Sequence, residues 1–219
     1  TTDSSKTMPA GTAFSTTVDD VSYQYVTIAD ITASGAGAEV KFNNVKIYEG
    51  TYITSKYLVD TSDVAQRFLL PDSRVDTSTL KVQVQNSASD STVATYTKAT
   101  DISQISSTSS VYFLQEVENG RHEIYFGDGN VSKSLSDGNI VILNYVVTNK
   151  TASNGASTFS APSSIDGVSD ITVTTVSNAG GGAEPESLAS IKLQAPLDYA
   201  SQGRAVTTDD YVTYTKKLF

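Results

Sequence analysis

Aspartate, glycine and asparagine stand side by side twice in this sequence, at residues 128–130 and 137–139. Carboxylate and amide oxygens are the ligands that Ca²⁺ prefers, and a helix-loop-helix calcium loop carries glycine at its sixth position and a bidentate glutamate at its twelfth. In a loop that began at Asp128, those positions would be Lys133 and Asn139. The spacing argues against calcium, and we predict no metal ligand in the chain.

The same tripeptides are typical of tight turns between strands. The segments around them, HEIYF at 122–126 and NIVILNYVV at 139–147, are rich in β-branched and aromatic residues. Glycine adopts positive φ without a steric penalty, and Asp-Gly is a common pair in hairpin turns. We therefore predict turns at two pairs of residues, Asp128 with Gly129 and Asp137 with Gly138.

Candidates for catalysis are few. His122 is the only histidine, so a Ser-His-Asp relay would have to pass through it, and no Gly-x-Ser-x-Gly motif accompanies it. We interpret His122 as a surface residue of a strand. Neighbouring carboxylates occur at Asp19 with Asp20 and at Asp209 with Asp210, where they point to opposite faces of a strand or favour a helix N-terminus. We predict no catalytic residue and no cofactor.

The composition excludes several classes of partner. Lys and Arg total 15 against 24 Asp and Glu, and the net charge of -9 opposes binding to nucleic acid or anionic lipid. Cysteine is absent, which excludes disulfides and thiolate metal sites. No window approaches the ~20 apolar residues of a membrane span. We therefore expect no nucleic-acid partner and no membrane partner.

Most of the 219 residues read as strands. In LKVQVQ at 80–85, Leu80, Val82 and Val84 alternate with polar residues, which is the pattern of a sheet buried on one face and typical of antiparallel folds. We predict a mainly β protein of antiparallel, sandwich-like modules followed by a short C-terminal helical region. The predicted strands cover 21–29, 38–50, 51–59, 79–85, 110–117, 122–127 and 139–149.

A first helix is predicted after the glycine-rich run at 178–187. Pro185 suits the first turn of a helix, and Pro196 is expected to end it. Between them, Leu188 and Ile191 lie on one apolar stripe. We predict that this stripe packs internally or against another subunit.

A second helix is predicted near the end of the sequence. Thr207 is a suitable N-cap, with Asp210 three residues later in a capping-box arrangement. Tyr211, Tyr214 and Leu218 then share a face. We predict the same packing or assembly role for this face.

The chain is expected to divide into three parts. Residues 1–61 and 151–178 form a discontinuous β module that includes a strand at 169–176, residues 62–150 form an inserted β module, and residues 179–219 form a linker with the helices. Glycine-rich and Ser/Thr-rich flanks make an insertion easy to accommodate. The predicted hinge comprises Gly180, Gly181 and Gly182.

Four stretches, in this order, carry a resemblance to a known family: MPAGTAFST at 8–16, VYFLQEVENGRHEIYFGDGN at 111–130, DGNIVILNYVVTNKTASNGASTF at 137–159 and GGAEPESLASIKLQAPLDYASQGRAVTTDDY at 181–211. They resemble the baseplate wedge proteins of contractile-tailed, T-even-type bacteriophages, a group related to the baseplate J family. The last stretch is the most specific, because its glycine-rich linker, acidic helix start and RAVT before DY rarely occur together.

The resemblance implies a structural, non-enzymatic component of the virion tail baseplate, made in the host bacterial cytoplasm. It implies that the protein self-associates as a homodimer or ring, joins neighbouring wedges around the tail hub together with other baseplate wedge proteins, and takes part in the rearrangement that triggers sheath contraction. The family has no catalytic residues to carry over.

Two alternatives remain open from the residues alone. Twelve tyrosines against seven phenylalanines suit a secreted or surface adhesion module that binds carbohydrate through exposed tyrosines. A hydrolase domain of a phage tail would instead need a catalytic carboxylate pair or a histidine relay.

Overall fold

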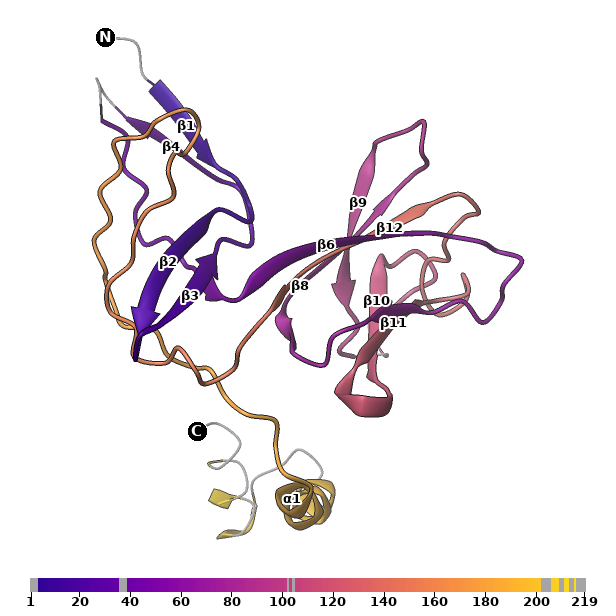
Figure 1. Ribbon diagram of the computed structural model, residues 1–219. Coiled ribbons are helices and arrows are strands. Elements are labelled where there is room, and N and C mark those ends of the chain that lie inside the picture. The colour runs from indigo at the N-terminus through magenta and orange to yellow at the C-terminus, as the bar shows by residue number, and fades with distance from the viewer. Residues whose placement is uncertain are drawn as a thin grey trace. The chain divides into compact units, whose positions relative to one another are not determined.

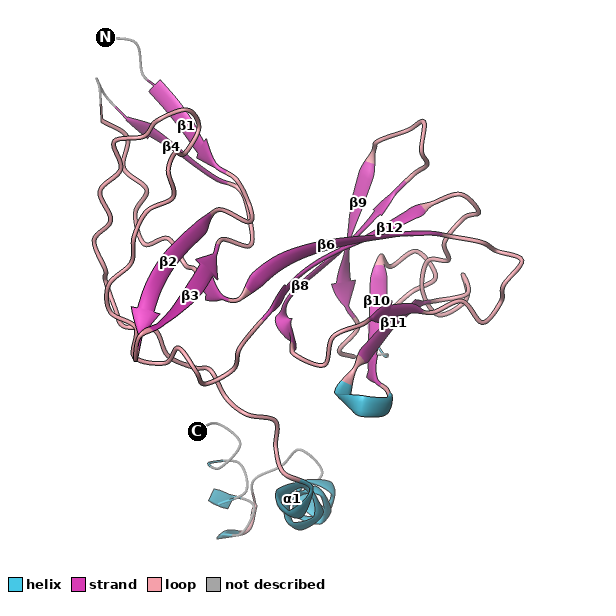
Figure 2. Ribbon diagram, viewed as in Figure 1, coloured by secondary structure: helices cyan, strands magenta, loops and turns pink. Residues whose placement is uncertain are grey.

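The computed structural model describes residues 4–35, 39–101, 103, 105–201, 206–208, 211, 212 and 215. The chain forms two compact units, Thr1–Gly182 and Ala183–Phe219. Strands make up most of the first unit, which we call the β unit. The second unit, which we call the helical unit, contains the described C-terminal helices and follows it in sequence (Figures 1 and 2). The predicted class, mainly β with a short C-terminal helical region, is confirmed.

Two small sheets lie at the N-terminal end of the first unit. Strands β1 (Ser4–Met8) and β4 (Ile31–Gly35) pair antiparallel, while β2 (Ala13–Val18), β3 (Val21–Val26) and β5 (Tyr48–Glu49) form a three-stranded sheet. Both are antiparallel throughout.

The carboxylates Asp19 and Asp20 form the two-residue turn between β2 and β3. Their φ angles are 49° and 63°, as in the mirror-image turns whose twist matches that of a hairpin. Aspartate tolerates this left-handed region better than most residues because its short side chain bonds locally. This pair therefore shapes a turn and forms no acid–base site.

A seven-stranded sheet makes up the rest of the first unit, in the order β6-β12-β8-β9-β10-β11-β7. All neighbours are antiparallel except β9 and β10, which are parallel. The 3-10 turn η2 (Glu118–Gly120), with Asn119 at φ 64°, joins β10 to β11. The strands are β6 (Thr51–Leu58), β7 (Phe68–Leu70), β8 (Val75–Gln85), β9 (Val93–Lys98), β10 (Val111–Glu116), β11 (His122–Phe126) and β12 (Ile140–Val147).

This sheet curls until its two edge strands meet, so that it approaches a barrel. The hydroxyl of Tyr57 in β6 donates to the backbone oxygen of Leu69 in β7 at 2.6 Å. The Tyr57 ring also meets Phe68 edge to face, with centroids 5.7 Å apart. The two edges thus contact each other through side chains, while no backbone ladder joins β6 to β7.

The interior of the curled sheet is one hydrophobic cluster. Val82 and Val84 are buried as their alternation predicts, whereas Leu80 is half-buried at its margin. From β12, Val141, Leu143 and Tyr145 point into the same cluster. Each such side chain contributes about 1.5–3 kcal/mol through burial, so this cluster dominates the stability of the sheet.

A second, smaller cluster lies under the N-terminal sheets. It joins Met8, Phe14 and Tyr25 to Ala156 and Ile165 from the segment after β12. The hydroxyl of Tyr25 is 2.7 Å from Ser153 Oγ and 3.0 Å from its backbone oxygen. Residues far apart in sequence therefore share one core.

Two predicted strands are wrong. Residues 169–176 form no strand, although Ile171 and Val173 pack against the second cluster, and only Tyr48–Glu49 of the predicted strand at 38–50 is part of a sheet. β propensity reflects how well a side chain fits a half-buried surface. Both segments supply such side chains, but apart from Tyr48–Glu49 their described residues take part in no sheet.

The strand pairing bears on the predicted insertion. β6, which the predicted boundary at residue 62 assigns to the N-terminal segments, pairs along its whole length with β12. The inserted module would then begin near residue 51. The division into a host and an inserted module stays a prediction.

The helical unit begins with α1 (Leu188–Ser201). Its N-cap is Ser187, whose Oγ accepts the backbone N–H of Ser190 at 3.2 Å, so the helix starts after Pro185 instead of with it. The helix also continues through Pro196, contrary to the predicted stop. Proline lacks one N–H donor, but its fixed φ near −65° is itself helical, and here the helix tolerates it. Within the described residues, no helix is long and apolar enough to cross a bilayer.

Candidate assembly surface

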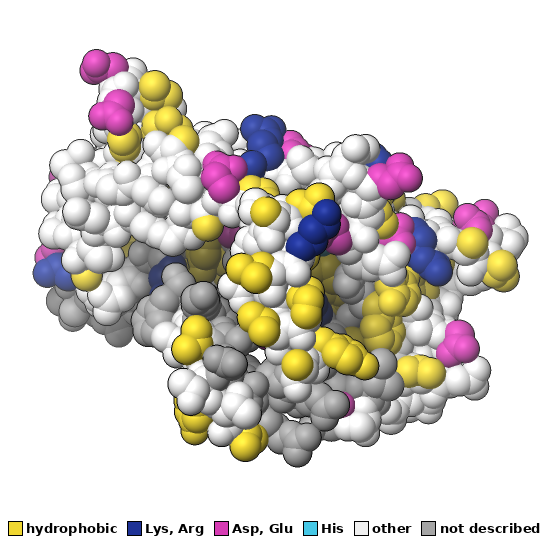
Figure 3. Space-filling view, turned by 90° about the horizontal axis from the view of Figure 1, so that it is seen from below, with side chains coloured by type: hydrophobic (Ala, Val, Ile, Leu, Met, Phe, Trp, Pro, Cys, Tyr) yellow, Lys and Arg dark blue, Asp and Glu magenta, His cyan; other side chains and the backbone are white. Residues whose placement is uncertain are grey.

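Apolar side chains are exposed on both sides of α1. Leu188, Ile191 and Tyr199 follow one stripe and are 66%, 43% and 84% exposed. Leu193 and Leu197, one turn apart, follow the opposite side and are 65% and 43% exposed. Figure 3 shows such hydrophobic side chains at the surface of the molecule. A helix that is apolar on two sides is normally covered by other protein on both.

The second predicted helix is only partly described. Helical backbone is present at Tyr211, whose N–H donates to the backbone oxygen of Thr207 at 3.2 Å. Tyr211 is 61% exposed. Tyr214 and Leu218, predicted to share its face, lie outside the described residues.

The three glycines of the predicted hinge have different surroundings. A Cβ at Gly180 or at Gly181 would meet nothing within 4 Å, and Gly181 has φ 89°. Gly182 is half-buried, and both of its backbone groups bond to the side chain of Asn154. The hinge stays a prediction, but the three positions are not equivalent.

The first Asp-Gly-Asn tripeptide is a turn closed by its own aspartate. Asp128 Oδ1 accepts the backbone N–H groups of Asn130 and Val131 at 2.9 and 3.4 Å, and Gly129 has φ 91°. The bond from the Asn130 backbone is the main reason that the pKa of Asp128 lies below its ordinary value.

The second tripeptide connects to another loop. Asp137 Oδ1 accepts the backbone N–H of Thr61 at 3.1 Å, and Gly138 has φ 76°. The N–H of Gly138 donates to the backbone oxygen of Val59 at 3.1 Å. No group of three or more His, Asp or Glu residues able to hold a metal occurs in the described part of the chain.

His122 lies in strand β11, as expected, and its side chain is half-buried. In the curled sheet β11 lies between two neighbours, where His122 faces Glu116 of β10 and Leu70 of β7 across the ladders. Its Nδ1 is buried and has no hydrogen-bond partner in the described structure. The histidine thus lacks the oriented base or acid that a catalytic relay requires.

Tyrosine serves mainly to pack the β unit. Nine of the eleven described tyrosines are buried or half-buried. Tyr199 and Tyr211 are the exposed ones, and both belong to the helical unit. The described sheets therefore present no fully exposed tyrosines of the kind that the carbohydrate-binding alternative requires.

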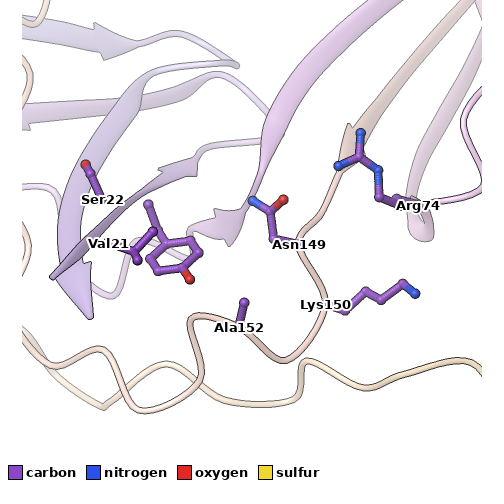
Figure 4. A pocket seen from close by; sticks show the side chains of 7 residues that line it. Val21, Ser22, Arg74, Asn149, Lys150 and Ala152 are labelled. Carbon is purple, nitrogen blue, oxygen red and sulfur yellow. The ribbon is translucent and has the colours of Figure 1, made fainter. Parts of the chain in front are cut away.

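A shallow hollow of about 520 Å³ lies where β3 approaches the segment after β12 (Figure 4). Arg74 and Lys150 line it, together with Tyr23 and Asn149. Its polar groups are engaged already, since Arg74 Nη2 lies 2.8 Å from a carboxylate oxygen of Asp72. The hollow offers no set of groups for a reaction.

The loop between β8 and β9 contains a carboxylate, Asp90, whose pKa is lowered by hydrogen bonds within the loop. Asp90 accepts hydrogen bonds from Asn86 Nδ2 at 2.8 Å and from the Thr92 backbone at 2.9 Å, which lower its pKa from 3.8 to about 2. A lowered folded pKa stabilises the fold fully above the ordinary value and loses that effect as pH falls through the folded value.

We therefore expect acid to destabilise the wild type more steeply than Asp90→Asn between about pH 4 and pH 2, the window set by the lowered pKa. The midpoint of thermal unfolding, measured at several pH values, checks this. Asp19→Asn removes the same charge from another turn and serves as the control. Parallel curves for the wild type and Asp90→Asn would contradict the expectation.

Comparison with known proteins gives two matches. Residues 53–158 match the family described as bacteriophage baseplate wedge protein gp6, third domain, a stretch that contains nearly all of the seven-stranded sheet. The chain is also 25% identical over 240 residues to the baseplate wedge protein gp6 of Enterobacteria phage T4, an alignment that covers 97% of this chain and 35% of that protein. The chain thus spans about a third of the length of this relative.

Proposed function

We propose that this chain, which is similar to the baseplate wedge protein gp6 of phage T4 and matches the family of its third domain over residues 53–158, self-associates and links neighbouring wedges into a ring around the tail hub. The resemblance to baseplate wedge proteins is confirmed, and the relationship supports a structural role in the tail baseplate of the virion. Participation in the rearrangement that triggers sheath contraction belongs to the same proposal.

The exposed apolar side chains of α1 carry this proposal. Contiguous apolar surface on a soluble protein marks a contact with other protein. Leu188 and Ile191 on one stripe, and Leu193 and Leu197 on the other, are more than two-fifths exposed. Burying one such side chain contributes about 1.5–3 kcal/mol. The partners we propose are a second copy of this protein and other baseplate wedge proteins.

The β unit supports a mechanical role. The edges of its seven-stranded sheet contact each other through Tyr57 and Leu69, and the sheet encloses one hydrophobic cluster that resists deformation because protein cores are closely packed. We propose that rigid β modules transmit position while the joint between the β unit and the helical unit lets the helical unit reorient. The role is structural, without a catalytic step.

Charge substitution on α1 tests the assembly role. In the full-length protein, Ile191→Glu and Leu193→Glu are each expected to weaken self-association or wedge assembly by about tenfold or more, because a carboxylate would enter an apolar interface. Sedimentation velocity measures self-association, and electron microscopy shows the assembled wedges.

Val64→Glu is the matched control, since Val64 is 95% exposed in a loop of the β unit. Circular dichroism checks that each variant retains its fold. If both α1 variants assembled like the wild type, α1 would not be the assembly surface.

A further inference from the structure

The segment that leaves the β unit is tied to the loop after β12 by backbone bonds. The N–H of Gly155 donates to the backbone oxygen of Ala179 at 2.8 Å, and the N–H of Ala179 donates to the oxygen of Ala156 at 2.8 Å. Both backbone groups of Ala179 are therefore bonded to this loop, although no strand forms there. The segment is therefore fixed up to Ala179.

Asn154 extends this attachment beyond the first two glycines. Its Nδ2 donates to the backbone oxygen of Gly182 at 2.9 Å, and its Oδ1 accepts the N–H of Gly182 at 3.1 Å. A side-chain amide has both a donor and an acceptor, so it can satisfy both backbone groups of one residue as a neighbouring strand would. Gly182, the last glycine of the run, is held in place.

Only glycine permits this approach. A Cβ at residue 182 would lie 2.1 Å from the backbone oxygen of Lys150 and 2.9 Å from Asn154 Oδ1. At Gly180 and Gly181 a Cβ would meet nothing within 4 Å. The run therefore consists of a two-residue open loop followed by a residue fitted closely against the β unit.

We infer that Asn154 is a clasp that holds Gly182 on the β unit, so that the joint to the helical unit begins at Ala183 instead of within the glycine run. The division into two compact units falls between these same residues, Gly182 and Ala183. Residues 183–187 are exposed and form no helix or strand before α1. The clasp depends only on contacts within the β unit, so it stands or falls independently of the proposed assembly.

Amide hydrogen exchange, followed residue by residue by NMR on the whole chain, tests the clasp. Asn154→Ala removes both bonds, and we expect the Gly182 amide to exchange at least about tenfold faster as this local structure opens more often. The Ala179 amide, bonded to Ala156, is expected to keep its rate. Asn178→Ala, an exposed asparagine in the same segment, is the control and should leave both rates unchanged.

Asn154→Asp separates the two bonds. It keeps an acceptor for the N–H of Gly182 and removes the donor to its oxygen, so we expect an exchange rate between those of the wild type and Asn154→Ala. If the Gly182 amide exchanged at one rate in the wild type and in both variants, the clasp would be refuted.

The position of the joint has a separate readout. Because the chain has no cysteine, Lys192→Cys carries a single dye on α1 whose anisotropy decay reports the motion of the helical unit. We expect Asn154→Ala to widen the amplitude of that motion, because the joint then extends back toward Ala179. An unchanged amplitude would mean that Gly182 does not limit the joint, and would overturn its placement at Ala183.

Discussion

Gly50→Ala is expected to lower the free energy of unfolding by about 2–6 kcal/mol. Gly50 is buried between β5 and β6 and has φ 124°, a conformation that side chains rarely adopt. A Cβ there would lie 2.1 Å from the backbone oxygen of Val147 and 2.8 Å from Val146 Cγ1. Backbone strain of about 1–3 kcal/mol adds to an overpacking cost of about 1–3 kcal/mol.

The effect is large because Gly50 lies where the chain passes between the two groups of sheets. The N–H of Gly50 donates to the backbone oxygen of Gln24 at 2.9 Å. Beside it, the Glu49 carboxylate accepts three bonds at 2.7 Å, from Thr148 Oγ1 and from the backbone N–H and Nδ2 of Asn149. The segment around Gly50 and the segment that follows β12 are thus held together here, and a clash at Gly50 disturbs both segments.

Urea unfolding measures this change, and Gly155→Ala is its control. Gly155 has a similarly unfavourable φ of 90°, but a Cβ there would meet nothing within 4 Å. Gly155→Ala therefore reports backbone strain alone, and the difference between the two variants reports the clash. Equal losses of stability in the two variants would show that the approach to Val147 is not rigid.

Sequence patterns identify some of these strands and not others. The runs that become β8 and β12 are recognisable because they are long and rich in β-branched residues. β1 consists largely of Ser, Thr and Lys, half of β9 is Thr and Lys, and β7 is three residues long. Such strands form because a partner strand lies beside them, and that information is not local.

The assembly surface is recognised in part for a related reason. Leu188 and Ile191 follow from helical periodicity, but an expected stop at Pro196 hides Leu197 and Tyr199, which lie on the continuing helix. The stripe through Leu193 is also invisible to a search for a single apolar face. A predicted helix that continues through Pro196 includes Leu197 and Tyr199, and Leu197 then lies on the same stripe as Leu193.

The sequence indicates the structural roles of Gly50 and Asn154 only weakly. Gly50 is the last residue of one predicted strand and directly precedes the next, a position where glycine most often marks a turn, and Asn154 is one polar residue in a Ser/Thr-rich loop. What distinguishes them is the backbone that approaches them, Val147 at Gly50 and Gly182 at Asn154. That approach depends on the folded chain, so no local pattern predicts it.

Leu143→Ala is expected to cost about 2–5 kcal/mol, as large-to-small changes in well-packed cores do. Leu143 on β12 is 0% exposed and belongs to the main hydrophobic cluster. Its strand is paired on both sides, with β6 and β8, so the backbone has little freedom to move into the space that the side chain leaves.

Leu58→Ala on β6 is the matched control: Leu58 is 64% exposed, and the loss of stability in this variant is expected to be within about 0.5 kcal/mol. Urea unfolding of both variants separates burial from residue type, and similar losses would mean that the curled sheet is not the stabilising core of the β unit.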